Sequence, residues 1–191
     1  MNLESALNKT FSIIDASPNF KTDLISRFNT LSFDKQDILL KPGHKADAIY
    51  YMDTGIGRKY IIVRERKITT RFITTGEMFI PAGIFSKSNI VEYFGFATNS
   101  TLLELSLDAI KEIVNLHPEG NLFFAALIDV ELQKSIQREH LLRLPHVNDR
   151  YDKFKELYPK IDQQVPYTII SSFLNMTNET FTRMRKGLNR S

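Results

Sequence analysis

From Phe33 to Leu107, short runs of β-branched and aromatic residues alternate with residues that favour turns. The breaks include Pro42-Gly43, Thr54-Gly55 and Thr75-Gly76. Several short strands at roughly ten-residue spacing are typical of a sandwich or barrel, so a β domain is predicted here. We expect its strands near residues 37–41, 48–53, 58–63, 68–74, 91–97 and 101–107. The apolar stretch 78–85 contains Pro81 and Gly83, which predicts an irregular or helical insert.

Helical periodicity flanks this β stretch on both sides. Apolar residues spaced by three and four predict helix within residues 3–30, interrupted where Ser17 and Pro18 can cap and begin a second piece. Ser106 can cap a helix at 107–116, and a long helix is expected at 118–144. A hinge at 144–148 precedes a further helix at 149–157.

The long helix carries two apolar stripes, which is more than one contact surface needs. One stripe comprises Phe124, Ile128, Leu132 and Ile136, and the other Phe123, Leu127 and Val130. One stripe is expected to pack on the β domain. The other, assigned to residues 124, 128, 132 and 136, would pack on a second copy of the chain. The alternative is a helix buried within a single domain.

Residues 165–188 have the pattern of two short helices joined by a tight turn. Pro166 suits the first turn of a helix, Asn175 tolerates positive φ, and Thr177 is a good N-cap for a second helix. Side chains in the first turns of that helix could enter a DNA major groove and contact base edges or phosphates. The candidate DNA-binding residues are Thr177, Asn178, Glu179, Thr182, Arg183, Arg185 and Lys186, and Arg190 would also meet phosphates. The alternative is a helical hairpin with a solvated charged face.

The distribution of charge supports a DNA-binding role for the same segment. The chain of 191 residues has a formal net charge of +3, and residues 167–191 hold four basic residues against Glu179 alone. The rest of the chain is electrically balanced. A local basic patch is a footprint for a polyanion, although charge alone equally fits a solvated tail.

Segment 170–186, ISSFLNMTNETFTRMRK, resembles the DNA-binding element of the Crp/Fnr family of bacterial transcription regulators, of the type IASYLGITPETLSRIRK. The resemblance implies that Glu179 and Arg183 contact bases. Ser171 and Asn175 replace the Ala and Gly that are common in the family, and both replacements are sterically mild. The chain stops at Ser191, so we expect the helix-turn-helix domain to lack a complete wing.

The resemblance extends to the β stretch. Lys41-Pro42-Gly43, residues 48–52 and Gly55 resemble the opening of a cyclic-nucleotide-binding-type β-roll, in which Gly43 and Gly55 would serve tight turns. The family resemblance implies an α+β fold with three parts. These are the N-terminal helices with the β-roll (1–117), a long dimerisation helix (118–144) and a small helix-turn-helix domain (145–191).

The phosphate-binding segment departs from the family. Family members that bind cyclic nucleotides use a Glu for the ribose and an Arg for the cyclic phosphate, but Pro81 and Ile90 stand near these positions here. An uncompensated phosphate is costly to bury, so we expect neither cyclic AMP nor cyclic GMP to bind well. The pocket would instead take an unknown apolar or uncharged effector, unless side chains simply fill the roll. Its candidate lining is Phe79, Ile80, Pro81, Ala82, Gly83, Ile84, Phe85 and Ile90.

Catalytic and metal sites are not predicted. The chain has no cysteine, its four histidines show no ligand spacing, and it has no nucleophile-elbow, phosphate-loop or dinucleotide-binding motif. Without a signal peptide or an apolar stretch long enough to span a bilayer, a cytoplasmic protein with no membrane partner is expected.

These patterns predict a homodimeric, sequence-specific DNA-binding regulator of bacterial transcription that is not an enzyme. Its expected partners are double-stranded DNA and a second copy of itself, with RNA polymerase as a further candidate. The alternative is a small-molecule-binding or scaffold module whose DNA-binding domain is degenerate.

Overall fold

A computed structural model describes residues 3–159 and 161–188. Its centre is a β-roll of two four-stranded sheets in which every strand pairing is antiparallel. One sheet has the order β1 (Asn29–Phe33), β8 (Ser100–Ser106), β3 (Ala48–Thr54) and β6 (Met78–Phe79). The other has the order β2 (Ile38–Leu40), β7 (Tyr93–Phe96), β4 (Ile56–Val63) and β5 (Arg66–Thr74). The predicted β domain is therefore confirmed.

Two strands differ from the sequence expectation. Residues 29–33, which overlap the end of the stretch expected to be helical, form β1 because all five pair with residues 100–104 of β8. The expected insert at 78–85 begins as strand β6, where Met78 and Phe79 pair with Tyr51 and Tyr50. Both strands depend on partners far away in the sequence, which local periodicity does not report.

Glycines make the turns that the sequence predicts. Gly43 and Gly55 both have positive φ, at +88° and +101°. A Cβ at Gly55 would also overlap the Ser100 side chain, so only glycine fits between β3 and β4. These turns close a core that includes Phe79, Phe94 and the fully buried Tyr51.

Three helices form one end of the molecule: α1 (Leu3–Ile13), α2 (Pro18–Ser26) and α3 (Leu107–Leu116). Two predicted caps are present. Ser17 Oγ accepts from the N–H of Phe20 at 3.2 Å, and Ser106 Oγ accepts from the N–H of Ala109 at 3.1 Å. Each cap satisfies one free amide at a helix start. Phe11, Phe20 and Phe123 pack together beneath these helices.

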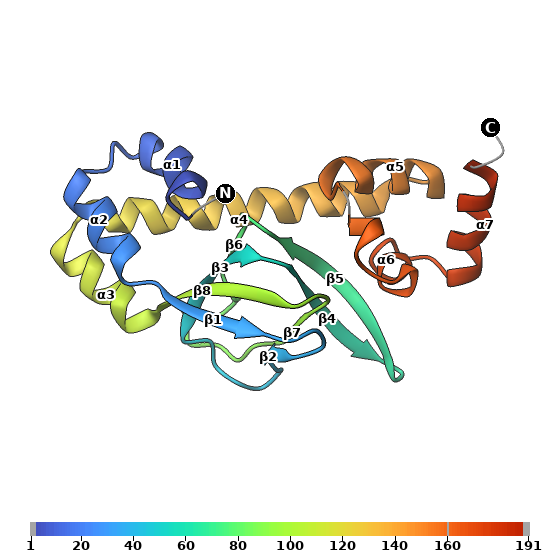
Figure 1. The fold of residues 1–191 in the computed structure, drawn as a ribbon, viewed down its shortest axis with the longest axis horizontal. Helices are drawn as coiled ribbons and strands as arrows, with labels where there is room; N and C mark the ends of the chain where they lie inside the picture. Colours follow the sequence, from blue (N-terminus) through green and yellow to red (C-terminus); the bar gives the residue numbers. More distant parts are fainter. Residues whose placement is uncertain (1–2, 160, 189–191) are drawn as a thin grey trace.

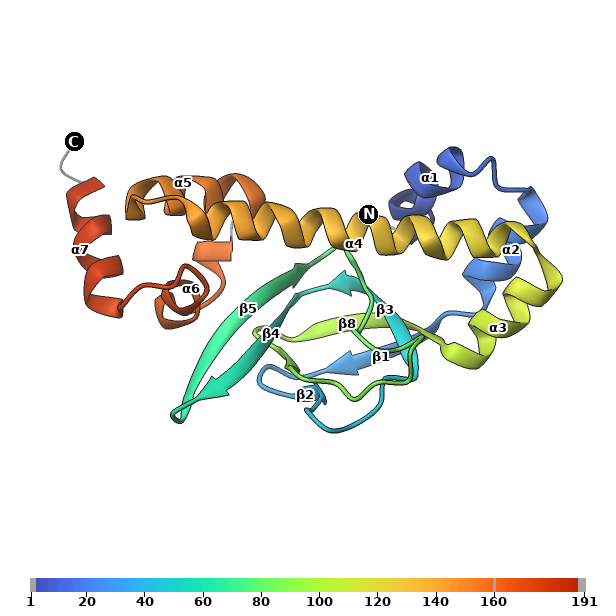
Figure 2. The same ribbon diagram turned by 180° about the vertical axis from the view of Figure 1, so that it is seen from behind.

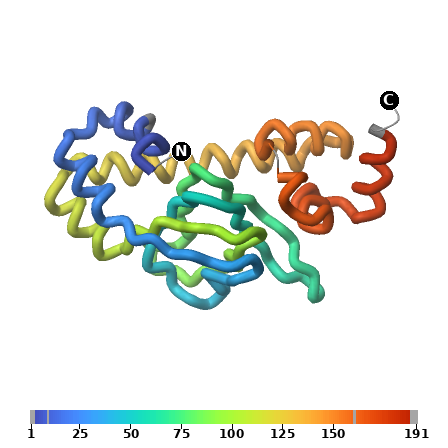
Figure 3. The backbone as a smooth tube through the Cα atoms, viewed as in Figure 1, coloured from blue at the N-terminus to red at the C-terminus, as the bar shows by residue number. Residues whose placement is uncertain are grey.

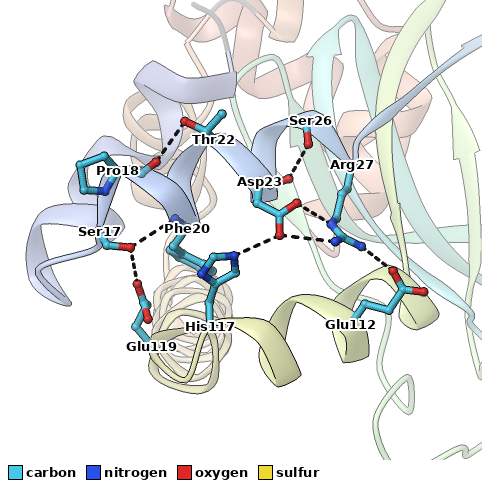
Figure 4. A network of polar contacts seen from close by, with 10 residues as sticks. All are labelled: Ser17, Pro18, Phe20, Thr22, Asp23, Ser26, Arg27, Glu112, His117 and Glu119. Carbon is cyan, nitrogen blue, oxygen red and sulfur yellow. Dashed lines mark hydrogen bonds and ion pairs between the residues drawn. The ribbon is translucent and has the colours of Figure 1, made fainter.

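A polar network joins α2 to the helices beside it (Figure 4). Arg27, the C-cap residue of α2, forms ion pairs with Asp23 of α2, at 2.9 Å, and with Glu112 of α3, at 2.6 Å. Asp23 also lies 3.1 Å from Nε2 of His117, the C-cap residue of α3, and Ser17 donates to Glu119 at 2.6 Å. The network therefore orients this helical end against the start of α4.

The long helix α4 (Glu119–Arg143) crosses the roll and leads to the C-terminal helices at its far end (Figures 1 and 2). These are α5 (Val147–Leu157), the short 3₁₀ helix η1 (Ile161–Gln163), α6 (Tyr167–Phe173) and α7 (Asn178–Leu188). The backbone trace also shows the β4–β5 hairpin extending toward α6 (Figure 3). Phe72 of β5 is buried in the C-terminal hydrophobic core, against Phe154, Tyr158 and Phe173. The roll and the C-terminal helices thus share a core.

Candidate functional site

Helices α6 and α7 are joined by a short turn at Asn175, whose φ is +53°. The N–H of Met176 donates to the carbonyl of Ser171 at 3.0 Å and closes the end of α6. Thr177 Oγ1 accepts from the N–H of Thr180 at 3.1 Å and caps α7. The turn and the cap therefore have the geometry that the spacing of Asn175 and Thr177 predicts.

One face of α7 packs inward and the opposite face is exposed. Phe181 and Met184 are buried in the C-terminal core. The exposed face carries Asn178, Glu179, Thr182, Arg183 and Lys186, which line one shallow surface hollow together with Gly187. The structure thus brings five of the seven candidate DNA-binding residues together on one surface.

Glu179 is held as a carboxylate on this face. Its pKa lies below the usual range because the carboxylate accepts hydrogen bonds from its own backbone N–H and from Thr177, and because Arg66 adds a positive potential. Asn178 is also held in place, since Ser171 Oγ donates to its side-chain oxygen at 2.5 Å. The first turn of α7 therefore presents an ordered acceptor and an ordered amide.

Two other candidates occupy different positions. Thr177 is exposed, but its hydroxyl is engaged in the cap. Arg185 lies apart from the exposed face, because its guanidinium packs 4.2 Å from the centroid of the Tyr167 ring. Arg190 is outside the described residues.

A cavity of about 570 Å³ lies between the roll, α4 and α5. Six of the eight predicted pocket residues line it: Ile80, Pro81, Ala82, Gly83, Ile84 and Phe85. Phe79 and Ile90 instead line a much smaller neighbouring space, to which Pro81, Ala82 and Lys59 also contribute. The predicted loop thus forms one wall of the cavity.

The other walls of the cavity carry more basic than acidic side chains, together with hydroxyl and apolar groups: Lys59, Thr70, Arg71, Ser86, Glu92, Glu131, Lys134, Ser135 and Arg138, with Ile128, Leu132 and Tyr158. Two of these cations are paired. Arg71 contacts both carboxylate oxygens of Glu131, at 2.5 and 2.9 Å, and Lys134 contacts Glu77 at 2.7 Å.

Among the described residues, Lys59 and Arg138 form no ion pair. Lys59 Nζ lies 4.6 Å from the centroid of the Phe79 ring, and its pKa is lowered by burial and by neighbouring Arg71. Arg138 Nε is buried with no hydrogen-bond partner, and so is the hydroxyl of Thr70. Buried polar groups normally find partners, so the cavity has unused capacity to bind an anion.

The same cavity reaches the C-terminal helices. Arg138 lies 5.6 Å from the ring centroid of Phe173 at the end of α6. Tyr158, at the end of α5, lines the cavity and contacts Phe173 edge-on, and burial raises its pKa to about 12. A molecule bound here would therefore touch groups that pack directly against α6.

Helix α4 leaves part of its apolar surface uncovered. Ile128, Leu132 and Ile136 are exposed, whereas Phe124 is buried in the core of its own chain together with Phe123 and Leu127. Val130, the last residue of the other predicted stripe, is exposed as well. The stripe expected to pack on a second copy is therefore shorter than predicted. The exposed stripe begins after Phe124, because the Phe124 ring packs against Phe123 and belongs to the hydrophobic core that includes α1, α2 and α3.

Sequence reasoning missed the basic walls of the cavity. Lys59 and Arg71 are directly opposed on β4 and β5, and like charges are unfavourable in such a pair. That signal needs the strand register, which a bulge after Lys59 shifts. Arg138 and Tyr158 gave no local signal, since their role follows from how α4 and α5 pack.

No group of three or more His, Cys, Asp or Glu side chains in residues 3–159 and 161–188 is placed to hold a metal ion. Within the same ranges, no helix is long and apolar enough to cross a membrane.

A family model described as the cyclic nucleotide-binding domain matches residues 30–117. No curated protein matches the sequence significantly. The family match runs from the second residue of β1 to just past α3, so it covers nearly all of the roll.

Several solved structures resemble the chain over most of its length. FixK2 from Bradyrhizobium japonicum is 15% identical with a TM-score of 0.72, covering 85% of each chain. CLP from Xanthomonas campestris, titled a c-di-GMP-responsive global regulator, is 17% identical with a TM-score of 0.70, covering 91% of this chain and 92% of its own. A CooA mutant from Carboxydothermus hydrogenoformans is 14% identical with a TM-score of 0.65, covering 95% and 84%. At such low identity the likeness concerns the fold: a cyclic-nucleotide-binding-type β-roll and a long helix, arranged as in Crp/Fnr regulators.

Proposed function

We propose that this chain is a non-enzymatic, sequence-specific DNA-binding regulator of transcription of the Crp/Fnr type that acts as a homodimer. The observation that carries the proposal is the exposed face of α7, where Asn178, Glu179, Thr182, Arg183 and Lys186 share one surface. Arg183 and Glu179 are suited to guanine and cytosine edges, and Lys186 is suited to phosphate. The fold shared with regulators supports the same conclusion.

Selection of bound duplexes from a random DNA pool, followed by binding assays on the selected site, tests this function. Arg183→Ala should lose discrimination at one base position, at a cost of about 1–3 kcal/mol. Lys186→Ala should weaken binding to all sequences alike and reduce the salt dependence. Lys111→Ala, an exposed position on α3, is the matched control and should change neither property.

The alternative function predicts no sequence-specific DNA binding. If the wild-type chain selects no sequence, with or without cell extract to supply an effector, the DNA-binding role is wrong. The chain would then be a small-molecule-binding or scaffold module that uses only its roll.

The cavity is proposed to bind the effector of this regulator. Because Lys59 and Arg138 form no ion pair within residues 3–159 and 161–188 and face an apolar loop, they favour a small molecule with an anionic group and an apolar part. This changes the sequence expectation of an apolar or uncharged effector. Ile90 still leaves the roll loop without the arginine that cyclic nucleotides need, so weak cyclic AMP binding remains expected.

Thermal-shift screening tests the effector. Organic acids should raise the melting temperature more than neutral molecules of matched size, and Arg138→Gln should reduce that rise because a ligand stabilises only the state that it binds. Arg143→Gln, at the exposed end of α4, is the control. Tight cyclic AMP binding in calorimetry, or a preference for neutral compounds, would contradict this assignment.

A further inference from the structure

The β4–β5 hairpin ends in a basic tip beside α7, the helix proposed to contact DNA. Its two-residue turn, Arg64-Glu65, leads directly into Arg66 and Lys67, and all four residues are exposed. Three of the four are cations, and none of the three forms an ion pair among the described residues. Figures 1 and 2 show this hairpin extending from the roll on the side of α6.

The tip is held against the C-terminal helices. The backbone N–H of Thr69 donates to Ser172 Oγ at 3.2 Å, and that hydroxyl donates to Thr69 Oγ1 at 2.9 Å. Phe72 packs on Phe173, with 5.1 Å between the ring centroids. Strand β5 therefore sets the position of the tip relative to α6 and α7.

A groove separates the tip from these helices. Arg66, Lys67 and Ile68 line one side of it, and residues of α6, of the turn and of the start of α7 line the other. Asn178 and Glu179 line both this groove and the hollow on the face of α7. The basic tip is thus continuous with the surface proposed to contact DNA.

The turn places two charged residues at backbone positions with positive φ, which such residues seldom adopt. Arg64 and Glu65 have φ values of +47° and +65°, a region that asparagine and glycine prefer in two-residue hairpin turns. Such strained positions are often functional. Double-stranded DNA presents one phosphate charge per about 1.7 Å of its axis, so a duplex lying on α7 would offer phosphates to nearby cations.

We infer that the tip of the β4–β5 hairpin is a second DNA-contacting element, in which Arg64, Arg66 and Lys67 bind backbone phosphates beside the sequence that α7 contacts. The inference rests on the proposed function, because it needs α7 to bind DNA. The tip adds affinity without sequence preference, since phosphates carry no base identity.

The test compares the full chain with two triple variants on the duplex selected by the wild type and on an unrelated duplex. R64N/R66Q/K67Q removes the cations and gives the turn a residue that tolerates positive φ. K35Q/K41Q/K45Q removes three exposed lysines in the loops that flank β2 and is the matched control. Binding is measured by fluorescence anisotropy across a range of salt concentrations, and folding by thermal melting.

R64N/R66Q/K67Q should melt no lower than the wild type and bind both duplexes more weakly by a similar factor. Its slope of log affinity against log salt should fall in magnitude by about 0.9 for each phosphate that the tip no longer neutralises. Its base preferences should be unchanged, and the control should match the wild type.

Two results would overturn the inference while the wild type still binds its selected site. Unchanged affinity and slope would show that the tip does not contact DNA. Tighter binding would show that the tip instead shields Glu179. If the wild type itself selects no sequence and Arg183→Ala has no effect, the proposed function fails, and this inference fails with it.

Discussion

Arg71 and Glu131 form the most enclosed ion pair among the described residues, with each side chain 13% exposed. They join β5 to the middle of α4 through two parallel hydrogen bonds. Such a pair contributes little net stability compared with apolar packing, but removing one partner leaves an uncompensated buried charge. The pair therefore constrains how α4 lies on the roll and forms one edge of the cavity.

Glu131→Gln should lower the free energy of unfolding by about 3 kcal/mol, because Arg71 keeps its charge in a poorly solvated place. The measurement is urea denaturation followed by circular dichroism. Glu139→Gln breaks an exposed pair with Arg143 and should change stability by less than about 1 kcal/mol. Equal losses in the two variants would mean that the cavity edge is open to water.

At the scale of elements, β5 is the link between the roll and α6. Ser172 Oγ is the partner of the Thr69 N–H, and Thr69 is 1% exposed. Ser172→Ala would leave that amide without an acceptor and should cost about 1–3 kcal/mol. Hydrogen exchange at the Thr69 amide should accelerate in this variant.

The control for this prediction is Ser12→Ala. The Ser12 hydroxyl donates to a carbonyl on the exposed side of α1, so its loss should change stability by less than about 0.5 kcal/mol. If Thr69 exchanges rapidly even in the wild type, the C-terminal helices are not packed on β5 in solution.

The network between α2 and α3 predicts a dependence on pH. Hydrogen bonding to Arg27, and then to His117, lowers the pKa of Asp23 below its usual value of 3.8. The folded state therefore gains stability from this carboxylate above about pH 4, and the gain is lost as the pH falls through the lowered pKa. Asp23→Asn should remove this part of the acid sensitivity in melts between pH 2 and pH 5. An unchanged pH profile would show that the Arg27 contact is too solvent-screened to matter.

At the scale of the whole molecule, the proposed homodimer would form through the exposed stripe on α4. Ile136 is 44% exposed and lies outside the lining of the cavity, so Ile136→Asp changes the stripe without changing that site. We expect the wild type to sediment as a dimer and this variant as a monomer. Wild-type melting temperature should also rise with protein concentration.

Val91→Asp is the control, because Val91 is an exposed apolar residue, at 72%, in a loop of the roll.

The dimer should bind a two-fold symmetric site with half-sites about 34–36 Å apart, whereas the Ile136→Asp chain should bind single half-sites only weakly. A wild type that sediments as a monomer at every concentration would contradict the role assigned to α4.

The sequence by itself determined the features that depend on neighbouring residues. The caps at Ser17, Ser106 and Thr177, the turn glycines and the opposed faces of α7 all follow from spacings of a few residues. Most strands of the roll were predicted for the same reason, since alternation and turn residues are local. Glu179 and Arg183 are four residues apart, so helical spacing also predicted that they share one surface, where the structure has them.

Only the tertiary structure decided which distant segments meet. It paired residues 29–33 with β8, buried Phe124, and placed Lys59 and Arg138 in one cavity with the predicted apolar loop. It also brought Arg66 close enough to Glu179 to lower the pKa of that carboxylate. These outcomes depend on strand register and on the way α4 and the hairpin pack, because burial and charge act through space and not along the chain.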